Sequence, residues 1–354
     1  MHPFEVSFTR DDVRITTRSN RNYLPASLFG TAHETGHGLY EQGVSSAHTR
    51  TVFATDLIGL YAVGGTSFGA HESQSRLWEN HVVRSRDFWR LHFPQLQASF
   101  PAQLGDVTGE DFYRAVTHIE PGLIRVEADE LTYDLHVMLR VDIECALMDG
   151  SIEVADLPDV WNAAIQRDLG VTVPHDGQGV LQDIHWSSGY IGSFPSYTIG
   201  NVMTEQLMDT LRQEDAELDD AISQGRYTQL ADQLRSRTWQ HGRCYSRVEL
   251  LVRATDARSM WRLTWLTWLT WAKNTLLRIP EPTGDRHRSP RSKSFTDLAQ
   301  QGAPRHRPQQ RKDRVCQPRA AAMVASRRSA FTATGRLTAS NNARSLIESL
   351  YPVL

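Results

Sequence analysis

The chain has 354 residues, of which 40% are hydrophobic and 22% are charged, a composition that is ordinary for a soluble globular protein of one or two domains. No stretch approaches the roughly 20 apolar residues that a membrane-spanning helix needs, and the N-terminus lacks the basic and apolar regions of a signal peptide. The three cysteines, Cys145, Cys244 and Cys316, lie far apart, which argues against a disulfide framework and predicts a cytoplasmic protein.

The first part of the chain is predicted to be a β-hairpin followed by helices. Apolar residues alternate on both sides of a turn signal over residues 4–18, which is typical of a hairpin. Helices are predicted where apolar residues recur every three or four positions: 24–43, a segment with Trp78, Val82 and Trp89, 128–150, 157–170, 200–222 and 226–256. The segment 171–200 is rich in Gly, Pro, Ser and aromatic residues, and a loop of this length is expected to be functional.

The sequence changes character after Ala257. Residues 263–271 read LTWLTWLTW, and a period of three fits neither an amphipathic helix nor a strand. Residues 281–354 carry 14 Lys and Arg against five Asp and Glu, although the whole chain has a net charge of −3. Such a polar segment buries too little apolar surface to fold. We therefore expect a folded domain over 1–257 and a repeat with a disordered basic tail over 258–354; nucleic-acid binding by the tail is not favoured.

A metal-binding pattern, H-E-x-x-H, occupies His33, Glu34 and His37. Two histidines four residues apart on a helix lie on one face, where both imidazoles can reach a single Zn²⁺. The glutamate between them points towards the open position of such a site and can accept a proton from water. The alternative is two surface histidines that happen to have this spacing.

The third ligand distinguishes the classes of zinc peptidase. A metzincin would have Gly at position 40 and His at position 43, and the presence of Tyr40 and Gly43 excludes that class. A later helix offers His71 and Glu72, which are adjacent, so only one of them is expected to face the metal. Composition does not choose between them.

Two other glutamates lie at helical spacing from these residues. Glu41, one turn after His37, could be a ligand, but a carboxylate that orients a ligand or a solvent-exposed residue is favoured. Glu79, seven residues beyond Glu72, could also support a ligand, and here solvent exposure is favoured.

Several strings match one family in the same order. They are D-x-R-x-T at 12–16, H-E-x-x-H at 33–37, H-E-S-Q at 71–74, I-R-x-x-A-D at 124–129 and G-x-x-Q-D-x-H-W at 179–186. Over roughly residues 2–256 the chain resembles the carboxypeptidase Taq family of zinc metallocarboxypeptidases. Any one of these strings could be accidental, but their common order makes the resemblance strong.

The resemblance implies His33, His37 and Glu72 as zinc ligands, in preference to His71, and Glu34 as the catalytic acid and base. It implies a mainly α, gluzincin-type metallopeptidase fold with a small β-hairpin near the N-terminus. It also implies one Zn²⁺ per chain, with Co²⁺ as a possible substitute, and a cytoplasmic homodimer that removes C-terminal residues from peptides with broad specificity.

The chain departs from the family at its N-terminus and in one connection. Family members have a long helical region before D-x-R-x-T, whereas Asp12 here is preceded by only eleven residues. The connection between His37 and Glu72 also looks longer than in the family. We therefore expect residues 1–257 to form a partial catalytic domain, and the alternative is a catalytically impaired, truncated relic of such an enzyme.

A carboxypeptidase also needs a group that binds the free carboxylate of its substrate. Arginine suits this task because its guanidinium can bind a carboxylate through two hydrogen bonds. Arg125 is the first candidate, and the alternative for it is an ion pair with Asp129 on the same helix. Arg14 is the second candidate, although an ion pair with Asp12 is favoured for it.

The long loop contributes further candidates. His185 could donate to the oxyanion of the transition state, and Gln182 or Tyr197 could hold the peptide. The alternative is a loop that is held together by its own hydrogen bonds and aromatic packing. Asp183 is expected to be a structural hydrogen-bond acceptor.

Overall fold

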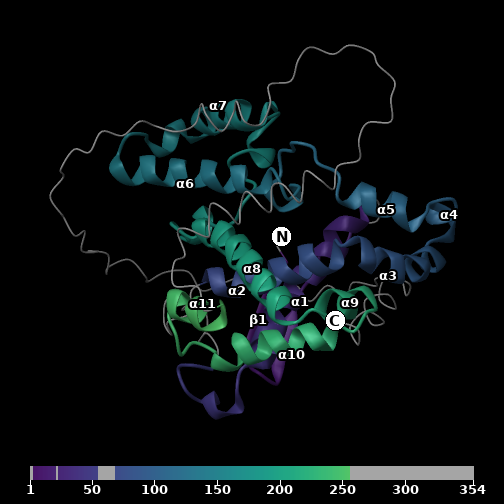
Figure 1. The fold of residues 1–354 in the computed structure, drawn as a ribbon. Helices are drawn as coiled ribbons and strands as arrows, with labels where there is room; N and C mark the ends of the chain where they lie inside the picture. The colour runs from purple at the N-terminus through teal and green to yellow at the C-terminus, as the bar shows by residue number, and fades with distance from the viewer. Residues whose placement is uncertain (1–2, 21–22, 55–67, 256–354) are drawn as a thin grey trace. The chain divides into compact units, whose positions relative to one another are not determined.

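The computed structural model describes residues 3–20, 23–54 and 68–255 (Figure 1). The described part is mostly helical and has one two-stranded sheet, which confirms the expected fold class. In this part of the chain, no helix combines the length and apolar character needed to cross a membrane. The expected repeat and basic tail, 258–354, lie outside the described residues.

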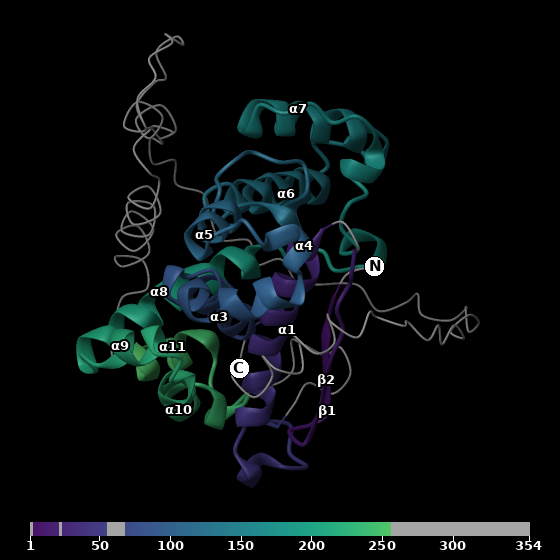
Figure 2. The same cartoon turned by 90° about the vertical axis from the view of Figure 1, so that its right-hand side faces the viewer.

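The expected hairpin consists of strands β1 (Glu5–Thr9) and β2 (Asp12–Ile15), which pair antiparallel. It packs along helix α1 (Leu24–Gly43), as Figure 2 shows. A Cβ atom on Gly38 would lie 3.2 Å from Val13, so the strand lies close against the helix. The hairpin therefore covers one side of the helix that carries the H-E-x-x-H pattern.

The next helical region differs from its prediction. Helix α2 (Phe68–Arg76) continues into a π-helical segment, Leu77–Val83, and a separate helix, α3 (Arg86–Ser99), follows. The predicted single helix through Trp78, Val82 and Trp89 is therefore wrong.

The physical reason for this break is a cap. The hydroxyl of Ser85 accepts a hydrogen bond from the backbone N–H of Phe88 at 3.1 Å and starts a new helix. Because both sides of the break present apolar residues to the same core, periodicity alone could not reveal it.

The remaining helices follow in chain order: α4 (Pro101–Leu104), α5 (Gly109–Val116), α6 (Tyr133–Asp149), α7 (Leu157–Leu169), α8 (Pro195–Glu214), α9 (Leu218–Ser223), α10 (Tyr227–Arg237) and α11 (Arg247–Thr255). Helices α6 and α7 end as predicted at Gly150 and Gly170, whose φ angles of 76° and 72° lie in the left-handed region. Helix α6 begins later than predicted, because the Asp129 carboxylate binds the N–H groups of Leu131 and Thr132 in a preceding turn.

Two other boundaries also differ from the prediction. The loop after α7 ends before Pro195 rather than at residue 200. Four helices, α8 to α11, occupy the region where two were expected, over 200–222 and 226–256. The break between α10 and α11 includes a short 3₁₀ turn, Trp239–His241. Turns with little apolar content are weak signals in a single sequence.

Helix α2 lies between α1 and α8, and two glycines allow this close packing. A Cβ atom on Gly36 of α1 would lie 2.5 Å from the backbone oxygen of Gln74, and one on Gly200 of α8 would lie 2.9 Å from Cβ of Glu72. No larger residue fits at either position without a shift of the helices. These contacts fix the position from which the Glu72 side chain extends.

We predict that Gly36→Ala lowers the free energy of unfolding by about 1–3 kcal/mol, because the added methyl group forces α1 and α2 apart. The measurement is urea unfolding of the full chain, followed by tryptophan fluorescence. Gly122→Ala is the matched control, since a Cβ atom at position 122 meets nothing within 4 Å. Equal losses in the two variants would contradict the packing role of Gly36.

Candidate metal centre

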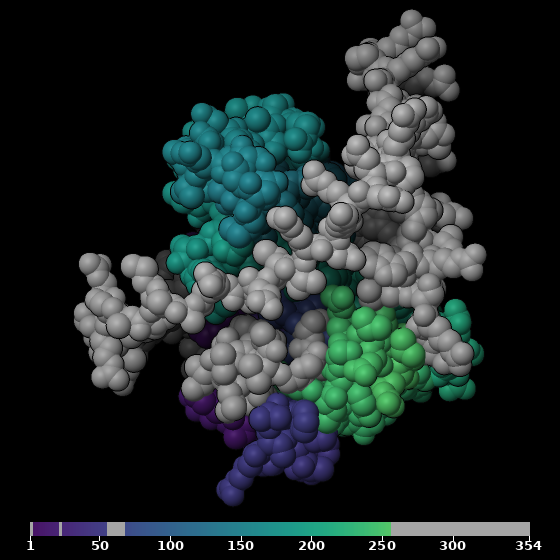
Figure 3. All heavy atoms as spheres, turned by 90° about the vertical axis from the view of Figure 1, so that its left-hand side faces the viewer, coloured from purple at the N-terminus to yellow at the C-terminus, as the bar shows by residue number. Residues whose placement is uncertain are grey.

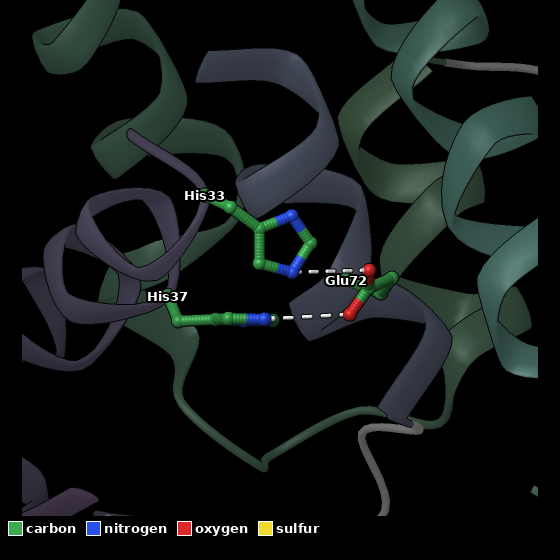
Figure 4. A group of neighbouring side chains, drawn as sticks. All are labelled: His33, His37 and Glu72. Atoms are coloured by element: carbon green, nitrogen blue, oxygen red, sulfur yellow. Dashed lines mark ion pairs between the residues drawn. The ribbon is translucent and has the colours of Figure 1, made fainter. Parts of the chain in front are cut away.

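Three side chains from α1 and α2 converge in the arrangement that a metal ion requires (Figure 4). Nε2 of His33 lies 3.4 Å from Oε1 of Glu72, and Nε2 of His37 lies 3.3 Å from Oε2. One ligand atom from each residue lies within 4.8 Å of the other two. Ligands of a tetrahedral Zn²⁺ are separated by about 3.3 Å, given zinc–ligand bonds of about 2.0–2.1 Å. We call these three residues the metal group.

The donor set of the metal group fits a divalent cation. Glu72 is 1% exposed, and neither of its carboxylate oxygens accepts a hydrogen bond within the described part of the chain. Burial raises the pKa of Glu72, but the neighbouring His33 and His37 outweigh it and lower the pKa to about 2. A buried carboxylate without a hydrogen bond needs a positive partner, and two imidazoles with one carboxylate suit zinc.

The two histidines have different environments. Burial lowers the pKa of His37 to about 4, which keeps its imidazole in the neutral form that binds metals. Burial also lowers the pKa of His33, but Glu72 and Glu79 outweigh it and raise the pKa to about 9. A cation bound by the metal group would displace that proton.

Glu34 lies next to His33 on α1 and is 3% exposed. Burial raises the pKa of its carboxyl group to about 7. A carboxyl group with this pKa can both accept and return a proton near neutral pH. The residue between the two histidines is therefore a candidate general base.

Glu79 supports His33 directly. Its Oε2 lies 3.0 Å from Nδ1 of His33 and 3.1 Å from Nη1 of Arg76, and its Oε1 accepts from Nη2 of Arg84 at 3.1 Å. The expectation of a solvent-exposed Glu79 is therefore wrong. The carboxylate is stable in this buried position because two guanidiniums and an imidazole surround it. Sequence spacing placed Glu79 on the correct face but did not reveal its arginine partners.

His71 and Glu41 form a series of polar contacts that starts at His37 of the metal group. Nδ1 of His71 lies 2.5 Å from Nδ1 of His37, and Nε2 of His71 lies 2.7 Å from Oε1 of Glu41. Glu41 is also held by Arg243, whose Nη1 donates to Oε2 at 3.1 Å. Of the two adjacent candidates for the third ligand, Glu72 faces the Nε2 atoms of both histidines, while His71 reaches only the opposite edge of His37.

Arg125 lies in a second buried group, away from Asp129. It is 2% exposed, and its Nη2 donates to Oδ1 of Asp183 at 2.8 Å, while Arg140 of α6 lies 2.6 Å from Oδ2. The alternative of an Arg125–Asp129 ion pair on one helix is wrong, because Arg125 sits in a 3₁₀ turn and Asp129 caps the next turn. Asp183 is a structural acceptor, as expected. We call Arg125, Arg140 and Asp183 the arginine group.

Aromatic side chains connect the arginine group to the metal group. The guanidinium of Arg125 lies 4.6 Å from the ring centre of Tyr197. The Tyr197 ring meets Phe68 edge to face at 5.8 Å, and Phe68 stacks on His37 at 6.4 Å. The hydroxyl of Tyr197 also lies 2.7 Å from Nε2 of His185. The structure thus brings Arg125, Tyr197 and His185 together.

The other two candidate substrate residues are engaged elsewhere. Gln182 accepts from the backbone N–H of Arg125 at 2.9 Å and donates to the carbonyl of Leu123 at 3.0 Å, so it holds its own loop. Arg14 is largely exposed on the hairpin, where its Nε donates to Asp12 at 2.7 Å. Both residues thus make the structural contacts that the sequence analysis gave as the alternative to substrate binding.

Electrostatics of the arginine group lead to a pH-dependent prediction. Burial alone would raise the pKa of Asp183, but the guanidiniums of Arg125 and Arg140 outweigh it and hold the pKa well below its usual range. Because the folded-state pKa is the lower one, the stabilisation is complete above the unfolded value of about 4 and is lost as pH falls below it.

Asp183→Asn should therefore lower the free energy of unfolding at neutral pH by about 3–5 kcal/mol, since two buried guanidiniums lose their counterion. The variant should also lose part of the pH dependence of stability below about pH 4. Urea unfolding at a series of pH values tests both effects. Asp168→Asn, which removes the partly buried partner of the exposed Arg167, is the control; a loss as large as that of Asp183→Asn would contradict the argument.

Comparisons with known proteins give consistent results. A model of the Carboxypeptidase Taq (M32) metallopeptidase family matches residues 1–267. The chain is 42% identical over 254 residues to Thermostable carboxypeptidase 1 of Thermus thermophilus, across 72% of this chain and 48% of that protein. It is 37% identical over 255 residues to Carboxypeptidase 1 of Bacillus subtilis, across 72% and 49% of the two chains.

A solved structure is also similar. The M32 carboxypeptidase of Deinococcus radiodurans R1 matches with a TM-score of 0.69 and 41% identity, over 77% of this chain and 54% of that one. The chain spans about half the length of the curated relatives it matches.

Proposed function

Since the chain belongs to the carboxypeptidase Taq (M32) metallopeptidase family, we propose that it is a zinc-dependent metallocarboxypeptidase that releases C-terminal residues from peptides with broad specificity. The observation that carries the proposal is the metal group, His33, His37 and Glu72, beside the buried carboxyl group of Glu34. We propose one Zn²⁺ per chain, with Co²⁺ as a possible substitute.

The metal, when bound, would supply Lewis acidity to the water and to the scissile carbonyl. Glu34 then accepts a proton from the attacking water and returns it to the leaving amine. A pKa of about 7 suits both steps, because the carboxyl group is neither a very weak base nor a very weak acid at neutral pH. His185, or Tyr197 through its hydroxyl, is the proposed donor to the oxyanion.

Arg125 is the proposed site for the terminal carboxylate of the substrate. Its contacts with Asp183 and Tyr133 in the described residues use Nε and one N–H on each of Nη1 and Nη2. A guanidinium has five N–H donors, so each terminal nitrogen keeps one for a substrate. Two guanidiniums also share the single carboxylate of Asp183, which favours an added anion. Arg14 and Gln182 are weaker candidates, given their own partners.

The assembled metal group does not favour the alternative of a catalytically impaired relic. We propose that residues 1–257 carry the catalytic part, that peptides are the substrates, and that the protein is cytoplasmic. The free thiols of Cys145 and Cys244 agree with a reducing compartment. A homodimer is proposed from the family resemblance alone, and light scattering would test it.

We predict that Glu34→Gln lowers kcat/KM by about 10²-fold or more, because glutamine cannot accept the proton from water. The variant should keep its zinc, since Glu34 is not one of the proposed ligands. The measurements are zinc content and hydrolysis of a peptide with a free C-terminus. Full activity in Glu34→Gln would remove this residue as the base, and a wild-type protein without bound zinc or hydrolysis would overturn the proposed function.

Arg125→Lys should lower kcat/KM for a peptide with a free C-terminus by about 10- to 100-fold, since lysine keeps the charge but not the paired hydrogen bonds. Hydrolysis of the same peptide with an amidated C-terminus should change much less. Arg140→Lys is the matched control, because Arg140 holds the other oxygen of Asp183. If the control reduces selectivity for the free carboxylate equally, Arg125 is not the carboxylate site.

A further inference from the structure

The two histidines of the metal group are supported in different ways. Nδ1 of His33 faces the Glu79 carboxylate directly at 3.0 Å. Nδ1 of His37 instead faces a second imidazole, His71, at 2.5 Å. Neither the general base nor the proposed carboxylate site uses His71, so its role needs a separate explanation.

The contact between the two imidazoles has the geometry of a hydrogen bond. Their ring centres lie 4.7 Å apart and their planes differ by 26°. With the Nδ1 atoms only 2.5 Å apart, the rings meet edge to edge and nearly in one plane. One nitrogen must donate and the other must accept, because two lone pairs or two N–H groups would repel at this distance.

Arg243, at the end of this series of hydrogen bonds, determines which of the two Nδ1 atoms donates. Arg243 has only donors, and it binds both oxygens of the Glu41 carboxylate. An ionised carboxylate has only acceptors, so Nε2 of His71 must donate to Glu41. With its proton on Nε2, His71 has its lone pair on Nδ1, which accepts a hydrogen bond from the Nδ1–H of His37. The remaining lone pair of His37 then lies on Nε2, facing Glu72.

Burial favours this arrangement. The side chain of His71 is 13% exposed and that of Glu41 is 2% exposed, so little water competes for these hydrogen bonds. The ring of Tyr40, 4.9 Å from that of His71, restricts rotation of the imidazole.

We propose that His71, held by Glu41 and Arg243, is a positioning residue that fixes the tautomer of His37 and directs its Nε2 lone pair to the metal. This inference rests on the proposed metal-binding role of His33, His37 and Glu72. It assigns a function to three residues that lie outside the metal group and the proposed carboxylate site.

Two substitutions at position 71 distinguish positioning from simple packing. His71→Gln keeps one acceptor for His37 and one donor for Glu41, whereas His71→Phe keeps a ring but neither polar atom. In the full chain, His71→Phe should weaken zinc affinity by about 10- to 100-fold, and His71→Gln should restore most of it. The measurement is competition for zinc with a chelator of known affinity. His81→Gln, which breaks the separate His81–Glu205 pair, is the matched control and should bind zinc normally.

A second measurement does not depend on any variant. In metal-free wild-type protein, ¹⁵N chemical shifts of the imidazoles should show His37 protonated at Nδ1 and His71 protonated at Nε2. The opposite tautomer at His37 would overturn the inference. Equal zinc affinity in wild type, His71→Phe and His71→Gln would also overturn it while leaving the proposed function intact. Failure of the wild-type chain to bind zinc would instead overturn the proposed function itself.

Discussion

The candidate site depends on the close packing of α2 between α1 and α8, which Gly36 and Gly200 permit. With a larger residue at either position, the backbone of α2 would have to move, and Glu72 would move with it. The two histidines come from one helix and need only the spacing of a single turn. The carboxylate comes from a different helix, so its position depends on interhelical distance. Backbone packing is therefore what converts a local sequence pattern into a three-residue metal group.

Electrostatics then separates the metal carboxylate from its neighbours. Three carboxylates around the site each contact a guanidinium: Glu79 with Arg76 and Arg84, Glu41 with Arg243, and Asp183 with Arg125 and Arg140. Glu72 accepts no hydrogen bond within the described part of the chain and faces two imidazole nitrogens. A buried charge requires a partner, and the two imidazoles and one carboxylate form a donor set that a divalent cation takes. Figure 3 shows the face on which the helices near the end of the described chain, coloured green, lie.

Much of this arrangement was predictable from sequence, and the exceptions share a physical cause. Alternation gave the hairpin, helical spacing gave α1 and α7, and the ordered motifs gave the family, which the comparisons confirm. The helix break at Ser85 was missed because both sides of it face one core. A supporting role was considered for both Glu41 and Glu79, but the burial of Glu79 was missed, and the partners of both come from other turns and other segments. Arg243 is 202 positions from Glu41, and a single sequence carries no signal for such a contact.

Helix α8 links the metal group to the proposed carboxylate site. Gly200 lies against Glu72, and Tyr197, three residues earlier on the same face, lies under the guanidinium of Arg125. An exopeptidase that removes single residues must hold the terminal carboxylate at a fixed distance from the scissile bond, since one residue separates them. A short stretch of one helix that contacts both groups provides such a fixed distance, because a helical turn is stiff. The proposed specificity for chain ends would then follow from the spacing of these two contacts on α8.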